Sequence, residues 1–191
     1  MLASDRILLV RHGESTWNAE RRLQGQADTP LSDRGRREAA ARAPALDGSI
    51  PPGRGIASDL ERARETAALL GHADAPTDPR LREIDVGEWA GRPLTEFPPG
   101  FETSWRGGPL TPPGGETWEQ LVQRVGPAID ELVAAGGPWL VVAHGGVVRA
   151  AVVHLTGADA QRLEGPANCS VTVVAGGRLL SYAWTPELSL S

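Results

Sequence analysis

Two short apolar runs that both end in His-Gly constrain the fold of this chain more than any other feature. Arg6–Val10 leads into Arg11-His12-Gly13, and Trp139–Ala143 leads into His144-Gly145-Gly146. Neither run alternates apolar and polar residues, which is typical of strands in a sheet covered on both faces. If the two strands are parallel neighbours, His12 and His144 lie in the same crevice at the carboxyl edge of the sheet.

Helical patterns alternate with these strands. We expect helices over Ser32–Ala43, Asp59–Leu70, Glu116–Ala135 and Val147–Leu155, the third kinked or broken at Gly126-Pro127. We expect further extended segments at Gly55–Ser58 and Leu81–Val86, and a hairpin of Val171–Ala175 with Arg178–Ala183. This order predicts a three-layer α/β/α fold. Its sheet is mixed but mostly parallel, with helices on both faces and antiparallel strands at the C-terminal end.

No internal repeat or linker divides the chain, so residues 1–191 are expected to form a single domain. The least regular part is Pro93–Gly115, which is rich in proline and glycine. Long loops inside compact domains usually serve a function. We therefore expect this insert to form the lid of the pocket and to determine its specificity.

Composition excludes several classes of function. The net charge is −5, which argues against nucleic-acid binding, and all 19 basic residues are arginine. Lysine Schiff bases and the P-loop lysine are therefore excluded. A single cysteine, Cys169, permits no internal disulfide and no cysteine-rich zinc site. No apolar run suits a membrane helix or a signal peptide, so we expect a cytoplasmic protein with no membrane partner.

Histidine and arginine side chains at one sheet edge point to an anion site. Arg11 stands beside His12, and Arg62 follows another predicted strand. Guanidinium groups suit the oxygens of phosphate, which is the plausible tetrahedral anion. A zinc site on His12 and His144 is the rival use. Two arginines would repel the dication and no third ligand has a usual spacing, so we expect no metal.

Five motifs in order extend this picture: LLVRHGESTWN, LQGQADTPLSDRG, SDLERARETA, LREIDVGEWAG and VVAHGGVVR. Together they resemble the histidine phosphatase superfamily, the phosphoglycerate mutase-like proteins with an RHG signature. The resemblance runs from about Arg6 to Asn168. It implies the phosphoglycerate mutase-like fold, in agreement with the alternation of strands and helices.

The resemblance also implies roles. His12 matches the nucleophile that becomes phosphohistidine, Arg11 and Arg62 the phosphate-clamping arginines, and His144 the second histidine. Glu83 matches the acid that protonates the leaving oxygen. Substrate contacts are expected from Asn18, Gln24, Gly25 and Gly145. No cofactor is implied. Arg64 competes with Arg62, and Asp85 and Glu88 compete with Glu83; the register of the motifs favours Arg62 and Glu83.

Three functions remain open. We favour a phosphomonoester hydrolase acting on a small-molecule phosphoester; the alternative is a cofactor-dependent phosphoglycerate mutase. Mutases of this family carry asparagine where this chain has Gly146, and they use basic residues in the insert, where this chain has only Arg106 among apolar residues. That composition would suit a partly apolar phosphoester. A non-catalytic phosphate-binding relative is the third possibility. A homodimer is possible.

Overall fold

The computed structural model of the chain describes residues 6–101 and 110–185. Its strands are β1 (Ile7–Arg11), β2 (Gly55–Ala57), β3 (Trp139–Ala143), β4 (Val171–Ala175) and β5 (Arg178–Trp184). Its α-helices are α1 (Thr16–Ala19), α2 (Asp33–Leu46), α3 (Glu61–Leu69), α5 (Trp118–Ala134) and α6 (Gly145–Thr156). Short 3-10 helices are η1 (Pro79–Leu81), η2 (Gly87–Trp89), η3 (Leu94–Glu96) and η4 (Ala160–Arg162).

The five strands form one sheet in the order β2-β3-β1-β4-β5. β1 and β3 are parallel neighbours, as expected, with Val10 opposite Val142 and Arg11 opposite Ala143. The register therefore brings His12 and His144 out of the sheet side by side. β4 pairs antiparallel with β1 and with β5, which confirms the C-terminal hairpin.

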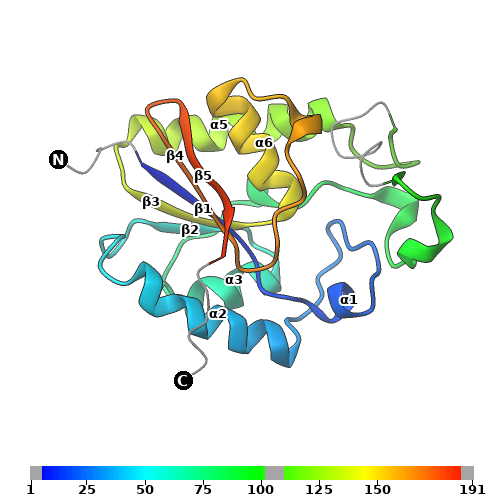
Figure 1. The fold of residues 1–191 in the computed structure, drawn as a ribbon, viewed down its shortest axis with the longest axis horizontal. Coiled ribbons are helices and arrows are strands. Elements are labelled where there is room, and N and C mark those ends of the chain that lie inside the picture. The colour runs from blue at the N-terminus through cyan, green and yellow to red at the C-terminus, as the bar shows by residue number, and fades with distance from the viewer. Residues whose placement is uncertain (1–5, 102–109, 186–191) are drawn as a thin grey trace.

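Helices cover both faces of the sheet, with α5 and α6 on one side and α2 and α3 on the other (Figure 1). Leu9 and Val141 face the α5 and α6 layer, whereas Leu8 and Leu140 face the α2 and α3 layer. Successive residues of a strand point to opposite faces, so both faces must be apolar when both are covered. This accounts for the two unbroken apolar runs and confirms the predicted three-layer α/β/α fold.

Helix α5 differs from the expectation because it continues through Pro127. Proline removes one backbone hydrogen bond from a helix. Here the apolar stripe of the helix, which includes Leu121, Val125 and Ile129, is fully buried against the core. Packing of this stripe offsets the missing bond.

Residues 82–86 form no strand, although an extended segment was expected there. The structure instead has η1 followed by an irregular stretch. Side chains from α5 and from the loop before it provide hydrogen-bond partners for the backbone of this stretch. A sheet neighbour is therefore not needed, and the segment can follow the edge of the site.

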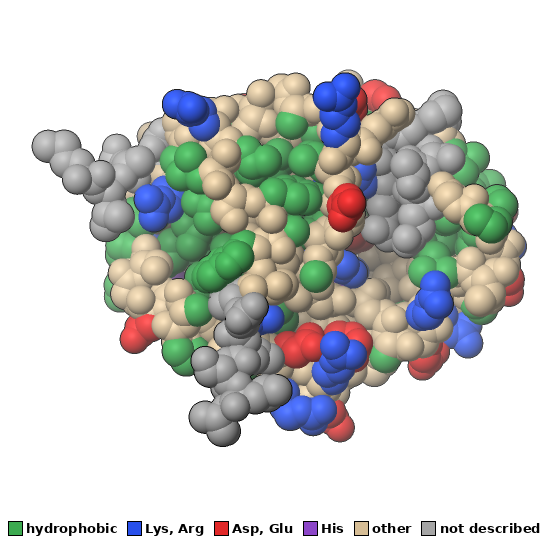
Figure 2. All heavy atoms as spheres, in the orientation of Figure 1, with side chains coloured by type: hydrophobic (Ala, Val, Ile, Leu, Met, Phe, Trp, Pro, Cys, Tyr) green, Lys and Arg blue, Asp and Glu red, His purple; other side chains and the backbone are tan. Residues whose placement is uncertain are grey.

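The edge strand β5 leaves three large apolar side chains exposed, Leu179, Leu180 and Trp184, of which Leu180 is the most exposed at 57%. Figure 2 shows apolar side chains gathered on this face. Among the described helices, none combines the length and apolarity that crossing a membrane requires.

The first turn of α2 packs directly on the loop that follows β1. A Cβ atom at Gly35 would lie 2.1 Å from the carbonyl oxygen of Glu14. Ser32 caps the helix by accepting the N–H of Gly35, and its hydroxyl donates to the Glu14 carboxylate. The loop that carries His12 and Gly13 is thus held by backbone contact with α2.

We expect Gly35→Ala to destabilise the protein by about 1–3 kcal/mol, because the new methyl group meets backbone that cannot move aside. Helix propensity alone would favour alanine by about 1 kcal/mol, so the predicted sign is opposite. Urea unfolding measures the effect. Arg37→Ala, an exposed change on the same helix, should stay within about 0.5 kcal/mol. A stabilised Gly35→Ala variant would show that the contact is loose.

Candidate active site

His12 is held at the end of β1 with one ring nitrogen facing backbone. The backbone N–H of His12 donates to the carbonyl of Ala143, which extends the β1–β3 ladder by one residue. Its Nδ1 lies 2.6 Å from the carbonyl oxygen of Gly13. Because a carbonyl only accepts, this contact assigns the proton to Nδ1 and leaves the lone pair on Nε2. The ring is therefore set up as a nucleophile.

Both histidines are buried and held neutral. Burial, then the charges of Arg62 and Arg11, lower the pKa of His12 well below its ordinary value of 6.5. Burial, followed by the same arginines and His12 among the neighbouring charges, lowers the pKa of His144 in the same direction. The two rings stand 5.1 Å apart between centroids. His144 Nε2 lies 2.8 Å from the hydroxyl of Ser58.

Arg62 is fully buried and directed inward. Its guanidinium donates to the carbonyls of Ala27 and Gly25 at 2.7 and 2.8 Å. Burial lowers the pKa of Arg62 to about 10, so the group remains cationic at neutral pH. Arg11 donates to the carbonyl of Pro166 at 2.6 Å. Backbone carbonyls thus orient both guanidinium groups, and the charges of Glu83 and Asp28 partly offset the effect of burial on the pKa of Arg62.

Among the buried side-chain atoms without a hydrogen-bond partner in the described part of the chain are Arg62 Nε and His144 Nδ1, both close to His12. Buried polar atoms are nearly always paired in folded proteins. An oxygen-rich anion beside His12 would supply acceptors for both. The same described ranges contain no group of three or more His, Cys, Asp or Glu suited to holding a metal ion.

Glu83 lies on the opposite wall, in contact with the start of α6. Its carboxylate accepts the N–H of Ile84 at 2.9 Å and the N–H of Gly146 at 3.1 Å. A Cβ atom at Gly146 would lie 2.3 Å from Glu83 Oε1. A side chain at this position would have to displace the carboxylate of Glu83 from its present place.

These groups border a cavity of about 500 Å³. Most of the predicted site residues line it: Arg11, His12, Asn18, Gln24, Gly25, Arg62 and Glu83. The other two predicted residues, His144 and Gly145, are not among the lining residues: the ring of His144 packs against that of His12, and Gly145 packs on Arg11, whose Nε would lie 3.7 Å from a Cβ atom there. Gln24 also has an internal role, since its Oε1 accepts from Ser15 and Thr29.

The composition of the insert Pro93–Gly115 indicated a partly apolar lining, but its described phenylalanines do not line the cavity. Phe97 and Phe101 stack on each other at 4.2 Å and pack against Trp89, away from the cavity. Within the described part of Pro93–Gly115, only Leu94 lines it. Arg106 lies outside the described residues, and a lid formed by this insert stays a prediction.

Several lining residues were missed in the sequence. Arg21, Gln161, Glu164 and Asn168 all border the cavity. Asn168 donates to the carbonyl of His12 and to Asn18 Oδ1, so it links the loop after β1 to α1. No strand or motif marks residues 161–168, and nothing in the local pattern indicates their return to the site.

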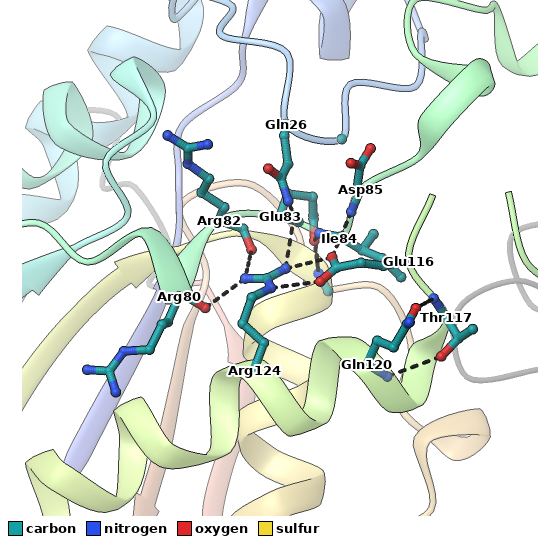
Figure 3. Close-up of polar contacts among 12 residues, drawn as sticks. Gln26, Arg80, Arg82, Glu83, Ile84, Asp85, Glu116, Thr117, Gln120 and Arg124 are labelled. Atoms are coloured by element: carbon teal, nitrogen blue, oxygen red, sulfur yellow. Dashed lines mark hydrogen bonds and ion pairs between the residues drawn. The ribbon is translucent and has the colours of Figure 1, made fainter. Parts of the chain in front are cut away.

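Behind Glu83, a second set of residues holds its backbone. Figure 3 shows Arg124 of α5 reaching the carbonyls of the Glu83 segment while paired with Glu116. Sequence reasoning did not single out either residue.

Comparison with known proteins agrees with this geometry. The profile of the histidine phosphatase superfamily (branch 1) matches residues 7–178. A glucosyl-3-phosphoglycerate phosphatase of Mycobacterium tuberculosis is 36% identical, covering 90% of this chain and 85% of the relative. A probable phosphoglycerate mutase GpmB of Yersinia pestis is also 36% identical, covering 88% of this chain and 83% of the relative.

Solved structures give the same result. The mycobacterial glucosyl-3-phosphoglycerate phosphatase in complex with VO3 superposes with a TM-score of 0.86 at 34% identity, covering 95% of this chain and 100% of the other. The expected family, fold and histidine-type phosphatase activity are confirmed by these matches. The chain belongs to the histidine phosphatase superfamily, branch 1.

Proposed function

We propose that this chain hydrolyses a small-molecule phosphomonoester through a phosphohistidine on His12, with Glu83 as the acid and then the base. One observation carries the proposal: the contact of Nδ1 with Gly13 leaves the lone pair of His12 on Nε2, and His12 lines one cavity together with Arg11, Arg62 and Glu83. Phosphoryl transfer depends mainly on positioning and charge stabilisation, which these groups supply without a metal ion.

The reaction has two balanced steps. In the first, Nε2 of His12 forms a bond to phosphorus, the ester P–O bond breaks, and the leaving oxygen takes the proton of Glu83. The His12 Nδ1 proton stays on its bond to the Gly13 carbonyl. In the second, water attacks phosphorus and gives a proton to the Glu83 carboxylate as the P–N bond breaks. Inorganic phosphate leaves and His12 is neutral again.

A phosphoglycerate mutase is the second candidate, because relatives of equal identity carry that name. Glycine at position 146 favours the hydrolase, since the mutases of this family have asparagine there. The Glu83 carboxylate lies where the Cβ of that asparagine would be. A cytoplasmic location, a homodimer and a single domain over residues 1–191 stay predictions.

The lining supports a hydrophilic substrate with a second anionic group. Arg21 borders the cavity, is exposed, and has no side-chain hydrogen bond or ion pair to another described residue. Its neighbour Arg22 is already paired with Glu20. Gln161 adds a further polar side chain to the lining. Relatives named for glucosyl-3-phosphoglycerate act on a phosphoester with a carboxylate, which agrees with a cation here.

His12→Ala should lower kcat for p-nitrophenyl phosphate by at least about 1000-fold, because the covalent route is lost. Intact-mass analysis of an alkali-quenched reaction should show one added PO3 group on the wild type and none on the variant. His154→Ala removes a histidine that pairs with Asp130 away from the cavity, and it should retain full activity. Equal rates for wild type and His12→Ala would contradict the proposal.

The imidazoles of His12 and His144 should stay neutral in the free enzyme down to well below pH 6.5, because burial and the arginines lower both pKa values. The unfolded chain binds these protons near pH 6.5, so the free energy of unfolding falls as the pH drops below that value. NMR titration of the ring protons measures the pKa values directly. Midpoints at or above 6.5 would contradict this account.

Arg21→Gln should raise KM for 3-phosphoglycerate by about tenfold and leave glycerol 3-phosphate unchanged, because a charge-assisted hydrogen bond to the carboxylate is lost. Arg64→Gln, an exposed arginine outside the cavity lining, serves as the matched control. Equal changes for the two phosphoesters would show that Arg21 does not recognise the carboxylate.

A further inference from the structure

The guanidinium of Arg124 is fully used in holding the segment that carries Glu83. Nη1 donates to the carbonyl oxygens of Arg80 and Arg82 at 2.7 and 3.0 Å. Nη2 donates to the carbonyl oxygen of Glu83 at 3.3 Å. Nε and Nη2 also grip the two carboxylate oxygens of Glu116 at 2.8 and 2.7 Å. A guanidinium has five N–H donors, and each of them has an acceptor here.

Glu116 extends the hold to the residue beyond Glu83. Its Oε2 accepts the N–H of Asp85 at 2.9 Å, and the N–H of Glu116 donates to the Asp85 carbonyl. Burial alone would raise the pKa of Glu116, but hydrogen bonds from Arg124 and Asp85 outweigh it and the pKa is lowered. The carboxylate therefore stays ionised at neutral pH, and the ion pair persists.

The segment has no sheet neighbour to fix it instead. Residues 82–86 form neither strand nor helix, and among the described side chains the Glu83 carbonyl has one further donor, Gln26 at 3.3 Å. On the other side of the same residue, the carboxylate touches the N–H of Gly146. The Arg124–Glu116 ion pair therefore fixes the backbone around Glu83, whose side chain borders the cavity. Figure 3 shows the bonds from Arg124 and Glu116 to this segment.

We propose that Arg124, locked by Glu116, is a positioning residue that holds Glu83 at the distance required for proton transfer to the leaving oxygen. This inference rests on the proposed function of Glu83. We expect turnover of substrates whose leaving group needs a proton to depend on Arg124. Turnover of substrates whose leaving group needs no proton should not depend on it.

The test compares two phosphoesters. Nitrophenolate leaves without a proton, whereas the alkoxide of glycerol 3-phosphate requires one. The measured quantity is kcat/KM, which reports the steps up to formation of phosphohistidine and is unaffected by its slower hydrolysis. We expect Arg124→Gln to lower kcat/KM for glycerol 3-phosphate by about 10- to 100-fold, since misplacement of about 1 Å has effects of this size. The value for p-nitrophenyl phosphate should change less than threefold.

Arg80 of η1, which pairs with Glu131 of α5, provides a matched control. Arg80 also bridges α5 to this part of the chain, through Glu131 and Asp78, but its side chain does not touch Glu83. Arg80→Gln therefore removes a comparable ion pair and should leave the ratio of the two kcat/KM values unchanged. Glu116→Gln weakens the lock while keeping Arg124 and should show a smaller loss with the same selectivity. If Arg124→Gln does not fold, Glu116→Gln provides the test of the positioning role.

Glu83→Gln distinguishes the acid role of Glu83 from the positioning role of Arg124. If it spares p-nitrophenyl phosphate and disables glycerol 3-phosphate, Glu83 is the acid. The double variant Glu83→Gln/Arg124→Gln should then lose nothing further, because Arg124 acts through Glu83. Equal losses on both substrates for Arg124→Gln, or no loss on either, would overturn the positioning role. A Glu83→Gln variant without selectivity would instead overturn the acid assignment, and the positioning role with it.

Discussion

The parallel pairing of β1 with β3 is the interaction on which the site depends. Arg11 stands opposite Ala143, and the N–H of His12 continues the ladder to the Ala143 carbonyl. A parallel register shifted by one residue would turn each side chain to the other face of the sheet. Both faces are closely packed against helices, so side chains moved to the other face would not fit the core there. Core packing therefore secures the separation of the two imidazoles.

The site combines cations with neutral histidines in a buried setting. Arg62 keeps its charge at neutral pH because burial lowers its pKa only to about 10, while burial lowers the pKa of both imidazoles well below 6.5 and leaves them neutral. An arriving phosphate dianion would meet positive charge that has already been taken out of water and oriented. Such preorganisation is the main way in which proteins stabilise charge in a transition state.

The sequence allowed the two strands, their shared edge, and the convergence of His12, His144 and Arg62 to be predicted, because local apolar runs and motif order carry that information. The continuity of α5 through Pro127 could not be predicted, since a buried stripe outweighs a local rule. Nor could the roles of Arg124 or Asn168. Both side chains donate hydrogen bonds to backbone carbonyls far away in the sequence, as Asn168 does to the His12 carbonyl. Such bonds produce no periodic pattern in the amino-acid sequence.

The contact between the Glu83 carboxylate and residue 146 has a consequence for substitution at this position. A Cβ atom at residue 146 would lie 2.3 Å from the Glu83 carboxylate and 3.3 Å from Cδ2 of the buried Leu121. A substitution at the start of α6 would therefore disturb the carboxylate and the core of the α5 and α6 layer together.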